Sequence, residues 1–147
     1  MQEKGFEISN NILHFIHNDS DYLINLDLLE TLYLYQDQVV FVEYGKVKSV
    51  PSEIFDITEL AVELLRNHNY MVCGSKHVVN LNLVNSVHIV RQNDEKGLSD
   101  KYNLMLIFNN RTKKEITLNS WREAEKLYHQ IDDKLIEIKT NNKLGVN

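Results

Sequence analysis

The chain is poor in the residues that most often build specialised sites, with one cysteine, one proline and five glycines among its 147 residues. Cys73, standing alone, cannot form an intramolecular disulfide and offers no cysteine cluster for a metal ion. The glycines lie far apart along the chain, which excludes the glycine-rich loops that hold dinucleotides and nucleotide phosphates. Disulfide scaffolds and nucleotide-loop enzymes are therefore excluded as classes for this protein.

Long apolar runs are missing as well. No stretch approaches the roughly 18 apolar residues that a membrane span requires, and the start, MQEKGFEIS, lacks the features of a secretory signal. Hydrophobic residues make up 43% and charged residues 25% of the chain, as in ordinary globular domains. We therefore expect a cytoplasmic protein with no membrane partner, built as one compact domain or as two half-domains that share a core.

The two halves of the chain differ in charge. Residues 1–66 carry 12 acidic and 4 basic side chains, a balance of −8, and residues 67–147 carry 9 acidic and 12 basic ones, a balance of +3. Such a difference in charge gives information about the binding partners of a protein and not about its fold. A strongly acidic surface favours basic partners and repels a phosphate backbone.

One segment of the chain occurs twice. Residues 15–35 align without a gap with residues 70–90, at an offset of 55 positions. Most pairs that differ keep their apolar or polar character, and the four identical pairs are Ser20/Ser75, Asn25/Asn80, Leu26/Leu81 and Leu28/Leu83. Self-similarity at a fixed offset is typical of a fold built from one supersecondary unit used twice.

Each copy of this unit predicts a series of strands followed by a helix. Segments rich in β-branched and aromatic residues alternate with turn formers. The predicted strands are 12–17, 22–26, 30–36, 39–44 and 46–50 in the first copy, and 70–73, 77–81, 85–91, 103–108 and 114–118 in the second. The polar stretch Gln92–Lys101 is predicted to be a long hairpin loop, and Pro51 marks the end of the first series.

Two capping boxes mark the predicted helices. Asp56 stands three residues before Glu59, and Ser120 has the same relation to a later glutamate, Glu123. Apolar stripes at helical spacing follow both, the second comprising Trp121, Ala124, Tyr128, Ile131, Leu135 and Ile138. The sequence thus predicts an α+β fold of two tandem β-meander-plus-helix repeats, 1–69 and 70–138, packed with pseudo-twofold symmetry, with a flexible tail at 139–147.

No set of residues has the spacing of a catalytic or metal site. The tightest histidine pair, His14 and His17, occupies positions i and i+3 of a predicted strand, where the side chains point to opposite faces. Cys73 has no orienting base near it in the sequence, and free cysteines are commonly small buried hydrophobes. We therefore expect no enzyme, with no catalytic residues, no cofactor and no metal.

Several predicted strands are apolar on both faces, such as 39–44 and 103–108. Both faces of such a strand must be covered, by the sister repeat, a second copy of the chain or another protein. Together with the acidic first repeat, this favours a non-catalytic protein-binding module that occludes a surface, such as a small acidic inhibitor, immunity protein or phage anti-defence protein. We expect a basic protein partner or a homodimer. The predicted partner-binding residues are Asp19, Asp21, Asp27, Glu30, Tyr33, Tyr35, Phe41 and Glu43.

Two other functions stay open. A nucleotide or metabolite held between repeats or subunits would meet Asn25 and Asn80, unless each asparagine bonds backbone at a bend between strands. Single-stranded nucleic acid is the third function: aromatic side chains could stack on bases, and Arg111, Lys113 and Lys114 could contact phosphates. The sequence pI of about 5.6 argues against nucleic acid as a partner, so we do not expect one.

Overall fold

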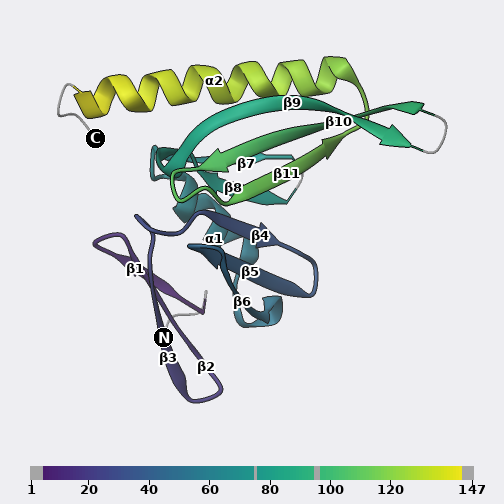
Figure 1. Cartoon of the computed structure of the whole chain (residues 1–147). Helices are drawn as coiled ribbons and strands as arrows, with labels where there is room; N and C mark the ends of the chain where they lie inside the picture. Colours follow the sequence, from purple (N-terminus) through teal and green to yellow (C-terminus); the bar gives the residue numbers. More distant parts are fainter. Residues whose placement is uncertain (1–4, 75, 95–96, 144–147) are drawn as a thin grey trace. The chain divides into compact units, whose positions relative to one another are not determined.

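The structure, a computed structural model, describes residues 5–74, 76–94 and 97–143 and confirms an α+β protein with antiparallel sheets. Its contacts divide the chain into two compact units, residues 1–80 and 81–147. Unit 1 contains a three-stranded sheet, a five-stranded sheet and helix α1 (Ile57–Leu65), and unit 2 contains a three-stranded sheet and helix α2 (Trp121–Lys143) (Figure 1). The predicted repeat boundary between residues 69 and 70 falls inside unit 1.

The first sheet of unit 1 is a meander of β1 (Glu7–Ser9), β2 (Ile12–His17) and β3 (Ser20–Asn25). Two-residue turns join its strands, and all four turn residues have φ between 51° and 63°: Asn10, Asn11, Asn18 and Asp19. Such type I′ geometry matches the twist of the strands, and asparagine and aspartate tolerate it well. These turn residues therefore fix the register of both hairpins.

The second sheet of unit 1 has the strand order β6-β5-β4-β8-β7, with β4 (Thr31–Leu34), β5 (Gln38–Glu43), β6 (Lys46–Pro51), β7 (Tyr70–Cys73) and β8 (His77–Asn80). A third tight turn, Tyr44-Gly45, joins β5 to β6. After the 3₁₀ turn η1 (Ser52–Ile54), Asp56 caps α1 by accepting the Glu59 N–H at 3.1 Å. This cap and the strands β2 to β8 confirm the sequence prediction, whereas β1 was not predicted.

The core of unit 1 is organised around Phe15, which is fully buried. Its ring stacks on Tyr22 and Phe41, at centroid distances of 5.0 and 5.7 Å, and meets Phe55 edge-on at 5.0 Å. Because these residues come from β2, β3, β5 and the segment before α1, one aromatic cluster joins both sheets of the unit. The buried leucines of α1 pack on the same cluster.

Unit 2 consists of η2 (Leu81–Leu83), β9 (Val84–Asp94), β10 (Gly97–Phe108), β11 (Lys113–Leu118) and α2. Helix α2 runs along the β11-β10-β9 sheet (Figure 1). Its buried side chains step by three and four residues and are Ala124, Leu127, Ile131, Leu135 and Ile138. They cover the buried face of the sheet, which presents Leu104, Leu106 and Ile116.

The prediction of a loop at Gln92–Lys101 is wrong for its described residues. β9 continues to Asp94, β10 begins at Gly97, and these two residues are partners in the ladder. β11 reaches only as far as Tyr102 along β10, so the hairpin extends beyond the three-stranded sheet as a two-stranded ribbon (Figure 1). A ribbon without a covering layer can be polar on both faces, which gives it the composition of a loop.

Two predictions about α2 also need correction. The helix continues to Lys143, so the predicted tail is helical over 139–143, and 144–147 lie outside the described residues. The predicted stripe contains Tyr128, but the structure buries Leu127 in its place and leaves Tyr128 half-buried. Trp121, the first residue of the predicted stripe, is 51% exposed. The cap prediction is confirmed, since the Ser120 hydroxyl accepts the Glu123 N–H at 3.2 Å.

The predicted pseudo-twofold pair of repeats is not confirmed. The two aligned segments share a local plan, which is a hairpin followed by a further strand: β2-β3 then β4, and β7-β8 then β9. Their pairing differs, because among the described strands β3 pairs with β2 alone, whereas β8 pairs with both β7 and β4. Ser75, one of the identical residues, lies outside the described part of the chain. The internal similarity therefore corresponds to a repeated hairpin and strand.

Candidate functional site

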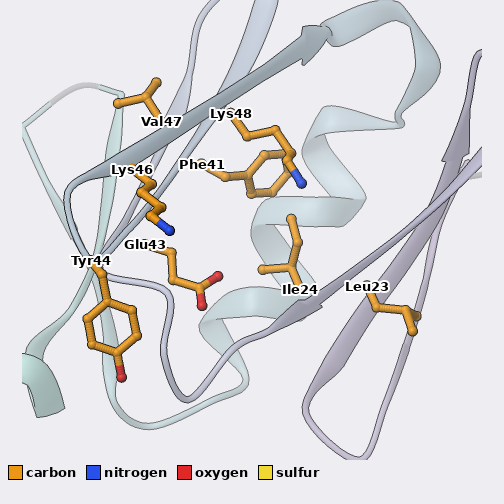
Figure 2. A pocket seen from close by; sticks show the side chains of 8 residues that line it. All are labelled: Leu23, Ile24, Phe41, Glu43, Tyr44, Lys46, Val47 and Lys48. Atoms are coloured by element: carbon orange, nitrogen blue, oxygen red, sulfur yellow. The ribbon is translucent and has the colours of Figure 1, made fainter.

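One pocket of unit 1 combines apolar walls with lysine side chains. It has a volume of about 400 Å3 and lies between β3 and the β5-β6 hairpin (Figure 2). Two of its lining residues, Ile24 and Phe41, are buried members of the core. The others are Leu23, Glu43, Tyr44, Lys46, Val47 and Lys48. The pocket is therefore amphipathic, and we call it the β3/β6 pocket.

The β5-β6 ladder sets the positions of the charged side chains in this pocket. Glu43 is the ladder partner of Lys46, and Phe41 is the partner of Lys48, so all four side chains share one face of the hairpin. Figure 2 shows both lysine chains directed toward Phe41 and Glu43. The Lys48 ammonium group also reaches β3, where it lies 4.7 Å from the centroid of the Tyr22 ring.

A buried carboxylate holds the turn of the same hairpin. Glu30, which is 2% exposed, accepts the Gly45 N–H at 3.0 Å. The other turn residue, Tyr44, has a φ of 51°. Left-handed backbone is uncommon for a bulky side chain, and it costs a residue with a Cβ about 1 kcal/mol. The pocket rim thus contains an aromatic residue in strained backbone.

A second cluster lies on the five-stranded sheet of unit 1. Tyr33 and Tyr35 stack at a centroid distance of 5.7 Å, and the His77 ring meets Tyr33 edge-on at 4.9 Å. The Lys76 ammonium group lies 5.9 Å from the centroid of the Tyr35 ring. Burial, and then the neighbouring Tyr35, raises the pKa of Tyr33 above its ordinary value. Rings and an ammonium group together suit a planar or anionic partner.

Unit 2 has an aromatic and basic cluster that sequence reasoning missed. The Arg91 guanidinium lies 5.7 Å from the Tyr102 ring centroid, and Tyr102 meets Trp121 edge-on at 5.5 Å. Trp121 also lines a pocket of about 380 Å3 on the helix side of β9, with Val87, His88, Ile89, Glu125, Tyr128 and His129. Arg91 and Tyr102 are partners in the β9-β10 ladder. Sequence reasoning missed this pairing because it interpreted Gln92–Lys101, the segment between the two residues, as a loop.

The three basic residues considered for phosphate contact do not share one surface. Arg111 and Lys113 are exposed in the β10-β11 hairpin, where Arg111 has a φ of 73°. Lys114 is only 6% exposed and is the ladder partner of Leu106, on the face that α2 covers. Adjacent strand residues point to opposite faces, which separates Lys113 from Lys114. Two of the three side chains are therefore accessible to an anion.

The predicted partner-binding residues do not form one exposed acidic surface. Glu30 and Phe41 are buried, at 2% and 3% exposure. Asp21 and Asp27 engage neighbouring side chains, at 2.9 and 2.5 Å respectively. The remaining members are distributed over three places: Asp19 in the β2-β3 turn, Tyr33 and Tyr35 on β4, and Glu43 in the β3/β6 pocket.

The two candidate ligand-binding asparagines bond the backbone of unit 1. Asn25 Oδ1 accepts the Asp27 N–H at 2.9 Å. Asn80, which is 1% exposed, donates from Nδ2 to the Leu26 carbonyl oxygen at 3.3 Å. Both side chains hold bends next to strands, which is the alternative that the sequence left open.

Other groups considered for chemistry are dispersed. Cys73 is fully buried at the end of β7, where it packs as a small apolar residue. Within residues 5–74, 76–94 and 97–143, no group of three or more His, Cys, Asp or Glu side chains could hold a metal ion. Over the same residues, neither helix has the length and apolar character that crossing a membrane requires.

No protein-family model matches the chain, and no curated protein matches it. Among solved structures, the chain is similar to the LytTr DNA-binding domain of a protein described as a methyl-accepting/DNA response regulator from Bacillus cereus. The TM-score is 0.51 at 11% sequence identity, and the likeness covers 81% of this chain and 97% of that domain. At this level of identity, the comparison shows a shared fold.

This likeness overturns two sequence predictions. A protein-binding inhibitor was wrong as the first choice of function, and the expectation that nucleic acid is not a partner was wrong as well. The physical reason is that net charge and pI average over the chain, whereas phosphates meet only the local surface. Unit 2 carries 11 basic and 9 acidic side chains and is therefore net basic, although the whole chain is acidic.

Proposed function

We propose that this chain is a DNA-binding protein without catalytic activity of its own, working in the cytoplasm. The observation that carries the proposal is the fold, because its solved neighbour is a DNA-binding domain and the likeness spans 97% of that domain. A fold alone does not define a function, since function resides in particular sites. The proposal therefore also depends on surfaces of this chain that suit DNA.

Unit 2 supplies such surfaces. Arg111 and Lys113 extend into solvent from the β10-β11 hairpin, where they can donate to phosphate oxygens. Arg91 is 40% exposed and lies 3.9 Å from the fully exposed carboxylate of Asp100, an ion pair that water screens strongly. Its guanidinium can therefore exchange this carboxylate for a phosphate. The Tyr102 ring lies between the Arg91 guanidinium and the half-exposed ring of Trp121, and it contacts both.

DNA selection tests the proposal directly. The full chain is mixed with a library of random duplexes at low salt, the retained DNA is sequenced, and the affinity of one selected duplex is measured against salt concentration. We expect a retained subset of sequences and a linear fall of log affinity with log salt, because each phosphate contact releases counterions. If no duplex from the library is retained and single-stranded DNA does not bind either, the proposal of DNA binding is wrong.

A matched pair of variants places the contact. Arg111→Ala combined with Lys113→Ala should weaken binding to all sequences and lower the magnitude of the salt slope by about 2, one for each phosphate contact. Lys139→Ala combined with Lys143→Ala removes the same charge from the far end of α2 and should leave the slope unchanged. If both pairs change the slope equally, the effect comes from overall charge and the hairpin is not a contact.

A further inference from the structure

We propose that the β3/β6 pocket of unit 1 binds a small organic anion, a carboxylate with an apolar aliphatic or aryl body. This site goes beyond DNA binding and involves only residues of β3 and of the β5-β6 hairpin. Its volume of about 400 Å3 lies at the small end of the range for ligand pockets, roughly 300 to 1,000 Å3. A small carboxylate is therefore of the right size class.

Apolar side chains in unusual exposure surround this pocket. Leu23 is 71% exposed and Tyr44 57%, and both line the pocket. Val47, which is 67% exposed, is the ladder partner of Val42 and lies on the face of the hairpin opposite to the two lysines. Single exposed apolar residues are ordinary on a protein surface, but two at one concave site indicate that an apolar group covers them. A ligand with an aliphatic or aryl body would remove this area from water.

The charges of unit 1 point to an anion. Within residues 5–80 there are 11 acidic and 4 basic side chains, yet two of those four basic residues, Lys46 and Lys48, line this one pocket. Against them stands a single carboxylate, Glu43, so the pocket is net positive within an acidic unit. The Lys46 side chain forms no hydrogen bond or ion pair with any residue that the structure describes. Its ammonium group is thus available for a ligand carboxylate, a charge-assisted hydrogen bond.

Backbone strain at the rim supports the same conclusion. Tyr44 has a φ of 51°, although asparagine, aspartate or glycine would occupy this turn position with less strain. The other two type I′ hairpins of unit 1 use only asparagine and aspartate at their turn positions. Strained residues cluster where a side chain has a binding role, and here the strain places an aromatic ring on the pocket rim.

A small molecule fits this site better than the DNA backbone does. Phosphates would pair with the lysines but would leave the apolar surface of Leu23 and Tyr44 exposed to water. The net negative charge of unit 1 would also repel a polyanion, whereas a single carboxylate meets mainly the nearby lysines. Occupation by DNA is therefore the competing outcome that the experiment must distinguish.

The test uses the full chain and a defined set of probes: octanoate, decanoate and 4-phenylbutyrate, each paired with its neutral primary amide. Binding is followed by the NMR amide shifts of β3, β5 and β6. We expect the carboxylates to shift these signals and the amides to bind about fivefold more weakly, the loss expected for one solvent-exposed charge pair. If no carboxylate shifts them, or if the amides bind equally well, the proposal is wrong.

Variants connect the shifts to the pocket. Lys46→Ala combined with Lys48→Ala should reduce carboxylate affinity at least to that of the amides, and Leu23→Ser should weaken carboxylates and amides alike. Lys76→Ala, on the other cluster of unit 1, is the control and should leave affinity unchanged. Because the three pocket side chains are exposed, the melting temperature of each variant should stay close to that of the parent. If a selected duplex causes the same shifts and displaces decanoate, the pocket is a phosphate contact and the small-molecule proposal fails.

Discussion

Gly5 occupies a position where the backbone of unit 1 leaves no room for a side chain. Its φ is 83°, and a Cβ added there would lie 1.9 Å from the carbonyl oxygen of Ile54. Gly5→Ala should therefore lower the free energy of unfolding by about 3 kcal/mol, as measured by urea denaturation. Gly97→Ala is the control, because its φ of 115° is also unfavourable but no atom lies within 4 Å of the added Cβ. We expect a loss of about 1 kcal/mol there, and equal losses would contradict the clash.

Tyr44 provides the opposite case, a residue whose replacement should stabilise the fold. Tyr44→Asn keeps the turn between β5 and β6 and relieves a strained φ of 51°. The free energy of unfolding should rise by about 0.5 to 1 kcal/mol. Lys46→Asn, at the first position of the following strand, is the control and should not stabilise. A stabilised Tyr44→Asn variant that binds decanoate less tightly would show that the strain accompanies a binding role.

The hydroxyl of Tyr70 joins β7 to the segment after β3. It donates to the Leu26 carbonyl oxygen at 2.5 Å within the core. Burial, and then the nearby Asp27 carboxylate, raises the pKa of Tyr70 above its ordinary value, because the anionic form is disfavoured there. Since the folded pKa exceeds the unfolded one, the contribution of Tyr70 to the free energy of unfolding should be constant below about pH 10 and fall as pH rises further.

Tyr70→Phe separates the two effects. It should lower the free energy of unfolding by about 1 kcal/mol at neutral pH, because the buried Leu26 carbonyl oxygen loses the shorter of two hydrogen bonds and keeps the one from Asn80. It should also flatten the decline above about pH 10, as followed by urea unfolding at a series of pH values. Tyr44→Phe removes an exposed hydroxyl and serves as the control. A variant that keeps the full alkaline decline would assign it to other groups.

At the scale of elements, the helix caps are the features that sequence spacing predicts best. Ser120 accepts the Glu123 N–H at 3.2 Å, and Glu123 in turn accepts the Asn119 N–H at 3.2 Å. Ser120→Ala should cost about 1 kcal/mol and speed amide exchange in the first turn of α2, as measured by NMR. Ser120→Asp keeps an acceptor and should restore both. If Ser120→Asp behaves like Ser120→Ala, the cap does not control the start of this helix.

Elements were predictable from sequence wherever local chemistry decides them. Turn residues such as Asn18 and Asp19, and alternating apolar residues on either side, define β2 and β3 closely. The β9-β10 ribbon was missed because Gln92–Lys101 is polar and none of its side chains whose burial is described is buried, so no period-2 pattern is imposed. The β3/β6 pocket was missed for a different reason. It depends on Leu23 and Lys48 approaching from two separate sheets, a relation that no short window of sequence contains.

At the scale of the whole molecule, the uneven charge has a consequence that can be measured. Residues 1–80 carry 12 acidic and 5 basic side chains, so like charges repel within unit 1, whereas DNA would be drawn to the basic side chains of unit 2. Raising the salt from about 10 mM to about 150 mM should therefore slow amide exchange in α1 and weaken DNA binding at the same time. Faster amide exchange in α1 at the higher salt, or DNA binding that does not weaken, would contradict this separation of charge.

Function was the hardest property to predict at this scale. The acidic balance of residues 1–66 led to a protein partner, although Arg111 and Lys113 were already visible as an exposed basic pair. Averages over the chain conceal where each charge lies, and the similarity to a DNA-binding domain is what motivates the proposal of DNA binding. At 11% identity to that domain, the sequence has no motif from which this similarity of fold could have been predicted.

The chain contains a single tryptophan, and it stands half exposed at the start of α2 beside Tyr102. Its emission spectrum is therefore a natural optical probe of unit 2, which needs no attached dye. A molecule that docks near Arg91 should therefore change the wavelength or the intensity of this emission, because Arg91 and Trp121 both contact Tyr102.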